Sequence, residues 1–177
     1  TVRINSDLFN VAGAKDTITF SFWQKDLNTA TNTSSFILFS PTVNRAIHGH
    51  VPWSDGNIYF DGPNCCGNGT RISGPGGLAS GEWTHFVFEK DGATKRVWVN
   101  GVKVLEGGGQ LALPTDSTEL WIGSERGTNS LNGFIDEFAV FDGPLTEKQV
   151  TLLSQGIAPK YLVGGDSDGD GLNDNWE

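Results

Sequence analysis

The sequence predicts an all-β fold, a two-sheet antiparallel sandwich of the jelly-roll type with one short C-terminal helix. Its composition supports this, because 24 glycines, 11 phenylalanines and 6 tryptophans among 177 residues are typical of a chain with many turns and aromatic strands. Short apolar or alternating segments recur along the chain with turn residues between them. The length fits one domain with a small appendage and permits a substantial core.

Eight segments carry strand patterns, and each is bounded by turn chemistry. In the first, Ile18, Phe20 and Phe22 alternate with polar residues and are expected on one face. Residues 91–94 predict a hairpin turn, and Asn100-Gly101 predicts a second tight turn. The predicted strands are residues 17–24, 35–40, 57–61, 83–90, 95–100, 102–105, 119–123 and 133–141.

One helix is predicted after the last strand. Thr146 is suited to cap it, with Gln149 three residues on as the reciprocal partner of a capping box. Leu145 and Val150 have the spacing of a hydrophobic staple, and Gly156 suits the C-terminal stop.

Five segments resemble the motifs of laminin-G-like, concanavalin-A-like jelly-roll domains, and the resemblance covers residues 1–158. The family implies two antiparallel sheets with one concave face, and it mostly binds sugars or proteins, often as a part of secreted enzymes. The segments are TITFSFW (17–23), GEWTHFV (81–87), VWVNG (97–101), LWIG (120–123) and GFIDEFAVF (133–141) followed by Leu145-Thr146.

The last twelve residues have the spacing of a calcium loop. Six oxygen ligands on a short arc suit a hard dication, and Gly171 stands where such a loop turns sharply. The segment resembles the calcium repeats of thrombospondin type 3, whereas the alternative is a disordered acidic tail. We therefore expect residues 1–158 to form the jelly roll, 159–165 a linker with Gly164-Gly165 as a hinge, and 166–177 a Ca²⁺ site. The predicted ligands are Asp166, Asp168, Asp170, the Leu172 carbonyl, Asp174 and Glu177.

The two cysteines, Cys65 and Cys66, are neighbours in a turn-rich segment and have no other intrachain partner. We predict a vicinal disulfide, with two reduced thiols or intermolecular bridges as alternatives. Such a ring would freeze the turn and present a flat, soft plate on which a sugar can stack, much as it stacks on an aromatic ring. A metal site is not expected here, because only two soft ligands lie together in the sequence.

Residues near the cysteines supply the other groups that a sugar pocket needs, namely apolar platforms and a few fixed polar side chains. His48 and His50 alternate around Gly49 and are expected on one side of a strand. The alternative for each residue is a structural role, as a core ring, a paired charge or a satisfied strand histidine. The candidate ligand-binding residues are Trp53, His48, His50, Asn57, Tyr59, Asp61, Arg71, Cys65 and Cys66, and Asp55 is a further hydrogen-bonding candidate.

The net charge and the lengths of the apolar stretches exclude two classes of function, nucleic-acid binding and membrane insertion. The net charge is −9; the calcium loop holds five of 21 acids, which leaves 16 acids against 12 bases elsewhere. A mildly acidic body makes nucleic acid an unsuitable partner. No stretch is long and apolar enough for membrane insertion. We expect the chain to be one part of a larger secreted or cell-surface protein, with that protein's other domains as partners.

Catalysis is not expected. Jelly-roll glycosidases typically place carboxylates on alternate positions of one strand, and no such segment is present. Adjacent Asp136 and Glu137 are expected on opposite faces of a strand. Asp136 lies in an apolar run, so a buried carboxylate with hydrogen-bonded partners or a second structural calcium is expected there. The prediction is a non-catalytic carbohydrate-binding module; the alternatives are an adhesion or protein-interaction domain and an architectural spacer.

Overall fold

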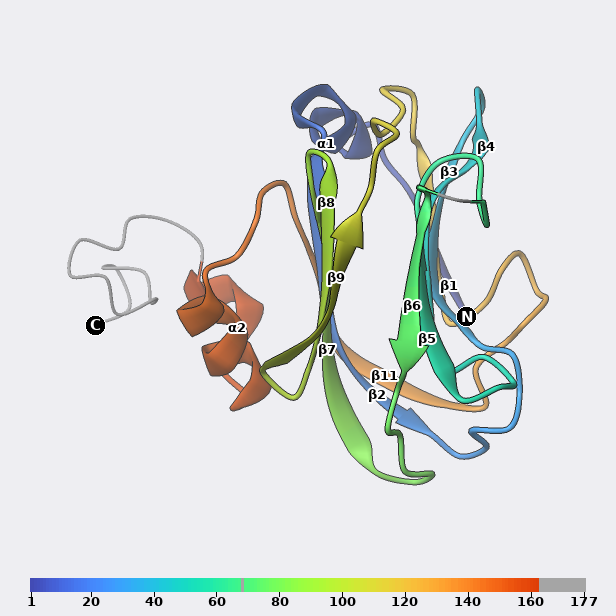
Figure 1. Ribbon diagram of the computed structural model, residues 1–177, viewed down its shortest axis with the longest axis vertical. Helices are drawn as coiled ribbons and strands as arrows, with labels where there is room; N and C mark the ends of the chain where they lie inside the picture. The colour runs from blue at the N-terminus through green and yellow to red at the C-terminus, as the bar shows by residue number, and fades with distance from the viewer. Residues whose placement is uncertain (68, 163–177) are drawn as a thin grey trace.

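The computed structural model describes residues 1–67 and 69–162 as two antiparallel sheets packed face to face (Figure 1). The predicted jelly-roll sandwich is therefore confirmed. One sheet has the order β1 (Val2–Asn5), β10 (Glu119–Ile122), β3 (Ser34–Ser40), β4 (Asn44–His50), β5 (Asn57–Asp61) and β6 (Arg71–Pro75). The other has the order β11 (Gly133–Phe141), β2 (Thr17–Asp26), β7 (Trp83–Asp91), β8 (Thr94–Val99) and β9 (Val102–Gly108). The predicted calcium loop and the Gly164-Gly165 hinge lie outside the described residues.

Aromatic side chains from both sheets meet in the core. The ring centroids of Phe20 and Phe36 are 4.1 Å apart, and those of Phe36 and Phe88 are 5.3 Å apart. Phe22 and Phe60 are also completely buried in this cluster. The period-two alternation of β2 produces this arrangement, because it sends every second residue into the sandwich.

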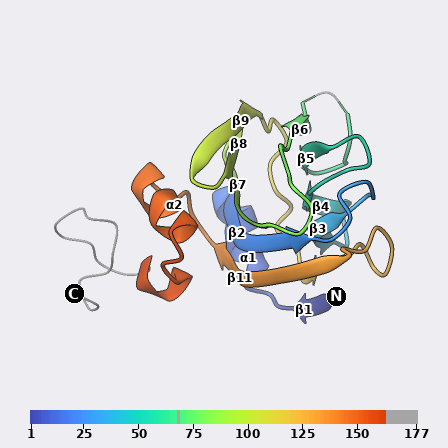
Figure 2. The same ribbon diagram turned by 90° about the horizontal axis from the view of Figure 1, so that it is seen from below.

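A helix, α2 (Glu147–Ser154), covers part of the outer face of the five-stranded sheet (Figure 2). Its first turn has the predicted capping box, in which Thr146 and Gln149 exchange hydrogen bonds. Val150 packs against Val87 and Trp98 of the sheet, with Leu145 beside them. The apolar side of α2 thus covers the part of the outer face around Val87 and Trp98.

The structure adds elements that the sequence patterns did not predict. The first strand, β1, is short and exposed, and β6 contains a glycine and a proline, which weaken a strand pattern. The helix α1 (Phe9–Lys15) begins without a side-chain cap and is followed by Asp16 in the left-handed region. A 3₁₀ helix, Pro159–Leu162, lies within the predicted linker. None of these four has a strong local signal.

The expectation of a buried Asp136 is wrong. A bulge in β11 between Asp136 and Ala139 disturbs the strand's alternation, and Glu137 takes a φ of 48° there. Both carboxylates are exposed, and Asp136 Oδ1 accepts a hydrogen bond from the Glu137 amide. The premise for a second structural calcium at this position is therefore lost.

Residues 62–67 and 69–70, together with residues 123–132, bury side chains on the outer face of the six-stranded sheet. Ile37 and Phe39 of β3 alternate with the core residues Phe36 and Leu38, yet both are buried. The Arg126 guanidinium lies 3.7 Å from the centre of the Phe39 ring. No helix in residues 1–67 and 69–162 is both long and apolar enough to cross a membrane.

Candidate functional site

The disulfide between Cys65 and Cys66 forms in the turn that follows β5, as predicted. Their Cα atoms are 3.7 Å apart, and Asn64, Cys65 and Cys66 all have positive φ angles. The Gly62 amide donates a 2.6 Å hydrogen bond to the Thr70 carbonyl and closes the base of the loop. Cys66 is exposed and Cys65 is half-buried, so the disulfide reaches solvent.

A buried lysine fixes this loop from inside the sandwich. Lys95 of β8 reaches across to the six-stranded sheet, and its Nζ donates to the carbonyls of Phe60 (2.7 Å) and Thr70 (2.5 Å). Burial lowers the pKa of Lys95 to about 8. These two hydrogen bonds attach the chain on both sides of the disulfide turn, at Phe60 and at Thr70, to strand β8.

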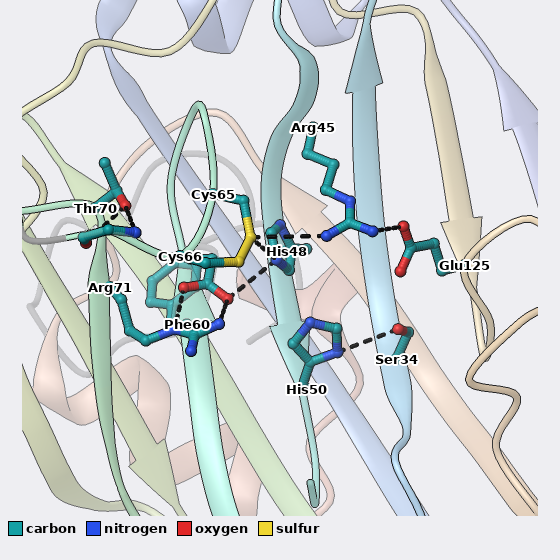
Figure 3. Close-up of polar contacts among 12 residues, drawn as sticks. Ser34, Arg45, His48, His50, Phe60, Cys65, Cys66, Thr70, Arg71 and Glu125 are labelled. Atoms are coloured by element: carbon teal, nitrogen blue, oxygen red, sulfur yellow. Dashed lines mark hydrogen bonds and ion pairs between the residues drawn. A yellow bond between two sulfur atoms is a disulfide. The ribbon is translucent and has the colours of Figure 1, made fainter.

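Beneath the disulfide, the side chains of His48, Asp61 and Arg71 lie in one row across β4, β5 and β6. His48 and Arg71 are labelled in Figure 3. Asp61 Oδ2 is 3.0 Å from His48 Nε2, and Arg71 donates two hydrogen bonds of 2.6 and 2.8 Å to the same carboxylate. His48 and Asp61 are completely buried. Burial opposes ionisation of Asp61, but the hydrogen bonds from Arg71 and His48 outweigh it and hold its pKa below the usual range.

The sulfur of Cys65 contacts this network directly. His48 Nε2 lies 3.5 Å from Cys65 Sγ, and Arg45 Nη1 lies 3.7 Å from it. The second terminal nitrogen of Arg45, Nη2, pairs with Glu125 in the loop after β10 (Figure 3). Arg45 therefore links the two segments that cover this face of the sheet.

An aromatic group stands beside the network. The ring centroids of His50 and Trp53 are 4.6 Å apart, and Trp53 and Tyr59 meet edge to face at 6.4 Å. The Arg71 guanidinium stacks 4.4 Å above the Tyr59 ring. Tyr59 donates a 2.6 Å hydrogen bond to Asp55, which also accepts from Asn57. These contacts fix the orientation of the Trp53 and Tyr59 rings on this face of the sheet.

His50 is held neutral within this group. Its Nδ1 lies 3.1 Å from Ser34 Oγ and 3.3 Å from the Thr33 carbonyl. Burial, and secondarily the neighbouring His48, lower the pKa of His50 to about 3.

The nine candidate ligand residues thus come together on one face of β4, β5 and β6 and the adjoining turns. Three of them, His48, His50 and Asp61, are buried and bonded to protein partners. The others reach solvent at least partly and are Trp53, Asn57, Tyr59, Cys65, Cys66 and Arg71.

Sequence reasoning did not assign Arg45, Glu125 and Lys95 to this site. Arg45 lies three residues before His48, but nothing in the local pattern indicates that it pairs with a residue 80 positions away. A lone lysine in a strand also carries no signal that it will cross the sandwich.

A cleft of about 410 Å³ adjoins the disulfide turn. Pro63 and Asn64, the two residues before the cysteines, form part of its wall. The remaining lining residues come from the loops before β4 and β10 and are Thr42, Val43, Leu111, Ala112, Leu113, Pro114, Thr115 and Asp116.

The family assignment follows from the match of residues 2–151 to the Laminin_G_3 family, described as the concanavalin A-like lectin/glucanases superfamily. The chain belongs to this superfamily, as the motifs in its sequence indicated. None of the curated proteins compared with the chain matches it.

Solved structures share the fold. Domain 4 of AbnA, a GH43 extracellular arabinanase from Geobacillus stearothermophilus in complex with arabinotriose, is 26% identical, with a TM-score of 0.63 over 79% of this chain and 67% of that one. A heptameric SAP-like pentraxin from Limulus polyphemus is 19% identical (TM-score 0.65, 78% and 70% covered). The CBM40 of a Ruminococcus gnavus IT-sialidase, bound to α2,3-sialyllactose, is 10% identical (TM-score 0.64, 86% and 92% covered).

Proposed function

We propose that this domain is a non-catalytic glycan-binding module of a larger secreted or cell-surface protein. The observation that carries the proposal is the solvent-accessible disulfide turn on the same face of the sheet as Trp53, with the buried rings of His48 and His50 between them. A rigid plate and an aromatic ring on one face offer apolar surfaces for sugar rings with little loss of side-chain entropy on binding.

The candidate residues divide into two roles in this proposal. Cys65, Cys66 and Trp53 form the stacking surface, while Asn57, Tyr59 and Arg71 border it with hydrogen-bonding groups. The buried residues His48, His50 and Asp61 act as positioning residues, because their side chains are bonded beneath the turn and the aromatic group.

The similarity to the arabinanase domain supports a glycan as the ligand, since that domain was solved with a bound trisaccharide and is part of an extracellular enzyme. The two less similar structures support the fold alone. The same reasoning supports an extracellular location and a parent protein with further domains. Residues 166–177 would add a Ca²⁺ site at the C-terminal end of the domain, held by the six oxygen ligands predicted above.

A glycan array in the presence of Ca²⁺ tests the proposal. We expect the wild-type protein to bind a set of glycans and a folded Cys65→Ala/Cys66→Ala variant to lose that binding. Trp53→Ala should weaken binding by about tenfold or more, because a stacking ring is a typical hot-spot residue. Trp83→Ala is the matched control, since Trp83 is 42% exposed on the opposite sheet. Binding that survives both site variants would place the site elsewhere, and no glycan binding by the wild type would refute the proposal.

A second candidate function is protein interaction, and an apolar surface favours it. A cavity of about 430 Å³ beside α1 is lined mainly by apolar side chains. Four of these side chains, Ile4, Leu8, Val11 and Val140, are exposed. Apolar exposure of this kind marks interaction surfaces in many proteins. A Leu8→Asp variant that abolishes attachment to a partner protein, with glycan binding unchanged, would support this function.

A further inference from the structure

The fold gathers four potential metal ligands at the disulfide turn, although the sequence offers only two adjacent sulfurs. His48 Nε2, a carboxylate oxygen of Asp61, Cys65 Sγ and Cys66 Sγ all lie within 4.8 Å of one another. His48 comes from a central strand and Asp61 from the end of its neighbour, so the two non-sulfur ligands stand on rigid elements.

The spacing of these atoms suits a tetrahedral ion. Metal–ligand bonds of about 2.0 to 2.3 Å give tetrahedron edges of about 3.3 to 3.8 Å. His48 Nε2 is 3.0 Å from Asp61 Oδ2 and 3.5 Å from Cys65 Sγ. Small shifts would therefore suffice to place His48, Asp61 and Cys65 around one ion. Cys66 would complete the set by turning away from Cys65 once the bond between the two sulfurs is broken.

Disulfide sulfurs are poor ligands, whereas thiolates are among the best for soft metals. The cluster is thus closed to a metal while the cysteines are bonded to each other. We propose that reduction of the Cys65–Cys66 disulfide opens a site for a soft divalent ion such as Zn²⁺ or Cd²⁺, ligated by Cys65, Cys66, His48 and Asp61.

The chemistry balances with a named reductant. A phosphine attacks the disulfide, and water supplies one oxygen to the phosphine oxide and two protons to the thiols. The metal ion then replaces both thiol protons, which pass to solvent. Two thiolates and one carboxylate around a dication leave one negative charge.

Two arginines near the site would balance this negative charge. Arg71 holds Asp61 through two hydrogen bonds and would orient the ligating carboxylate from outside the metal's coordination shell. Arg45 lies 3.7 Å from Cys65 Sγ and would favour its thiolate form. Cys66 is exposed, which gives the ion a path to an otherwise buried pair of ligands.

Titration of the full chain with Cd²⁺ tests the site, because only thiolate ligation produces the ultraviolet thiolate-to-cadmium absorption band. The carboxylates of residues 166–177 do not contribute to that band. We expect one equivalent of Cd²⁺ to produce it in phosphine-reduced protein, and no band in oxidised protein. His48→Gln should weaken Cd²⁺ binding by about tenfold or more, whereas His85→Gln, a buried histidine on the five-stranded sheet that is bonded to Ser21, should leave it unchanged.

Two results would overturn the proposal: no thiolate band in the reduced protein, or equal Cd²⁺ affinity in reduced wild type and His48→Gln. If His48→Gln fails to fold, the ¹¹³Cd resonance of the wild type decides instead. A chemical shift typical of two sulfurs with nitrogen and oxygen supports the site, and one typical of sulfur ligands with water alone refutes it. The metal site shares residues with the proposed glycan site but does not rest on that function, because Cd²⁺ binding is measured on reduced protein and glycan binding on oxidised protein.

Discussion

The outer faces of the two sheets are covered by opposite means. On the five-stranded sheet, helix α2 packs Val150 onto Val87 and Trp98, an apolar contact between regular elements. On the six-stranded sheet, an irregular loop with a disulfide covers a buried row of His48 and Asp61. Apolar packing needs no particular partner geometry, whereas a buried charge must be paired and hydrogen-bonded. The outer face of the five-stranded sheet also has a buried charge, Glu89, which pairs with Arg96. The six-stranded sheet has a buried His48–Asp61 pair beneath a solvent-accessible disulfide, and the candidate site lies there.

Truncating the Trp98 side chain, which packs beneath α2, should have the largest effect on stability. Trp98 is 3% exposed, so Trp98→Ala should lower the free energy of unfolding by about 4 kcal/mol through lost burial and a residual cavity. Urea denaturation measures this. Trp83→Ala, on the exposed part of the same face, should cost no more than about 1 kcal/mol. Equal losses in both variants would show that α2 does not seal the face.

Disrupting the row of His48, Asp61 and Arg71 should have the second largest effect on stability. Asp61→Asn removes the charge that pairs with Arg71 and His48. It should lower the free energy of unfolding by about 3 kcal/mol, because Arg71 and His48 then lack their charged partner. The same urea denaturation applies. Asp55→Asn is the control, since Asp55 is exposed and should contribute far less. A loss no greater than that of the control would mean that the row is not a structural unit.

Acidification should weaken both faces through one buried histidine each. Burial lowers the pKa of His85, beneath Trp23 on the five-stranded sheet, to about 4, and the pKa of His50 on the other sheet is about 3. Unfolded histidines bind protons near pH 6.5, so stability is present above that pH and falls between pH 6.5 and about 4.

The expected loss is about 2 to 3 kcal/mol for each histidine over that range, measured as the urea midpoint against pH. His85→Gln and His50→Gln should each flatten the curve. A pH profile that is unchanged in both variants would contradict the buried neutral state of these rings.

Removing the helix cap should have the smallest effect. Thr146→Ala deletes the side-chain partner of the Gln149 amide and should cost about 1 kcal/mol. Because the capping box lies at the start of α2, the change should leave glycan binding on the other sheet intact. A loss of binding in this variant would show that the two faces are coupled.

Much of the fold was predictable because its signals are local. The alternation in residues 17–24, the Asn100-Gly101 turn and the Thr146 capping box each depend on neighbours a few positions apart. The elements that were missed lack such signals: β1 is short and exposed, and α1 has no side-chain cap. Asp136 was misplaced because a bulge, which has no reliable local pattern, changed the register of β11.

Periodicity, motifs and the adjacent cysteines predicted the family, the sandwich and the disulfide, because all three are properties of the chain. The sequence also placed the candidate residues within one segment of 24 positions. Which of these residues are buried and which reach solvent depends on how the strands and loops pack. The contacts of Arg45 with Glu125 and of Lys95 with the Phe60 carbonyl join segments that are distant in sequence. Such contacts depend on sheet register and loop path, which local pattern does not encode.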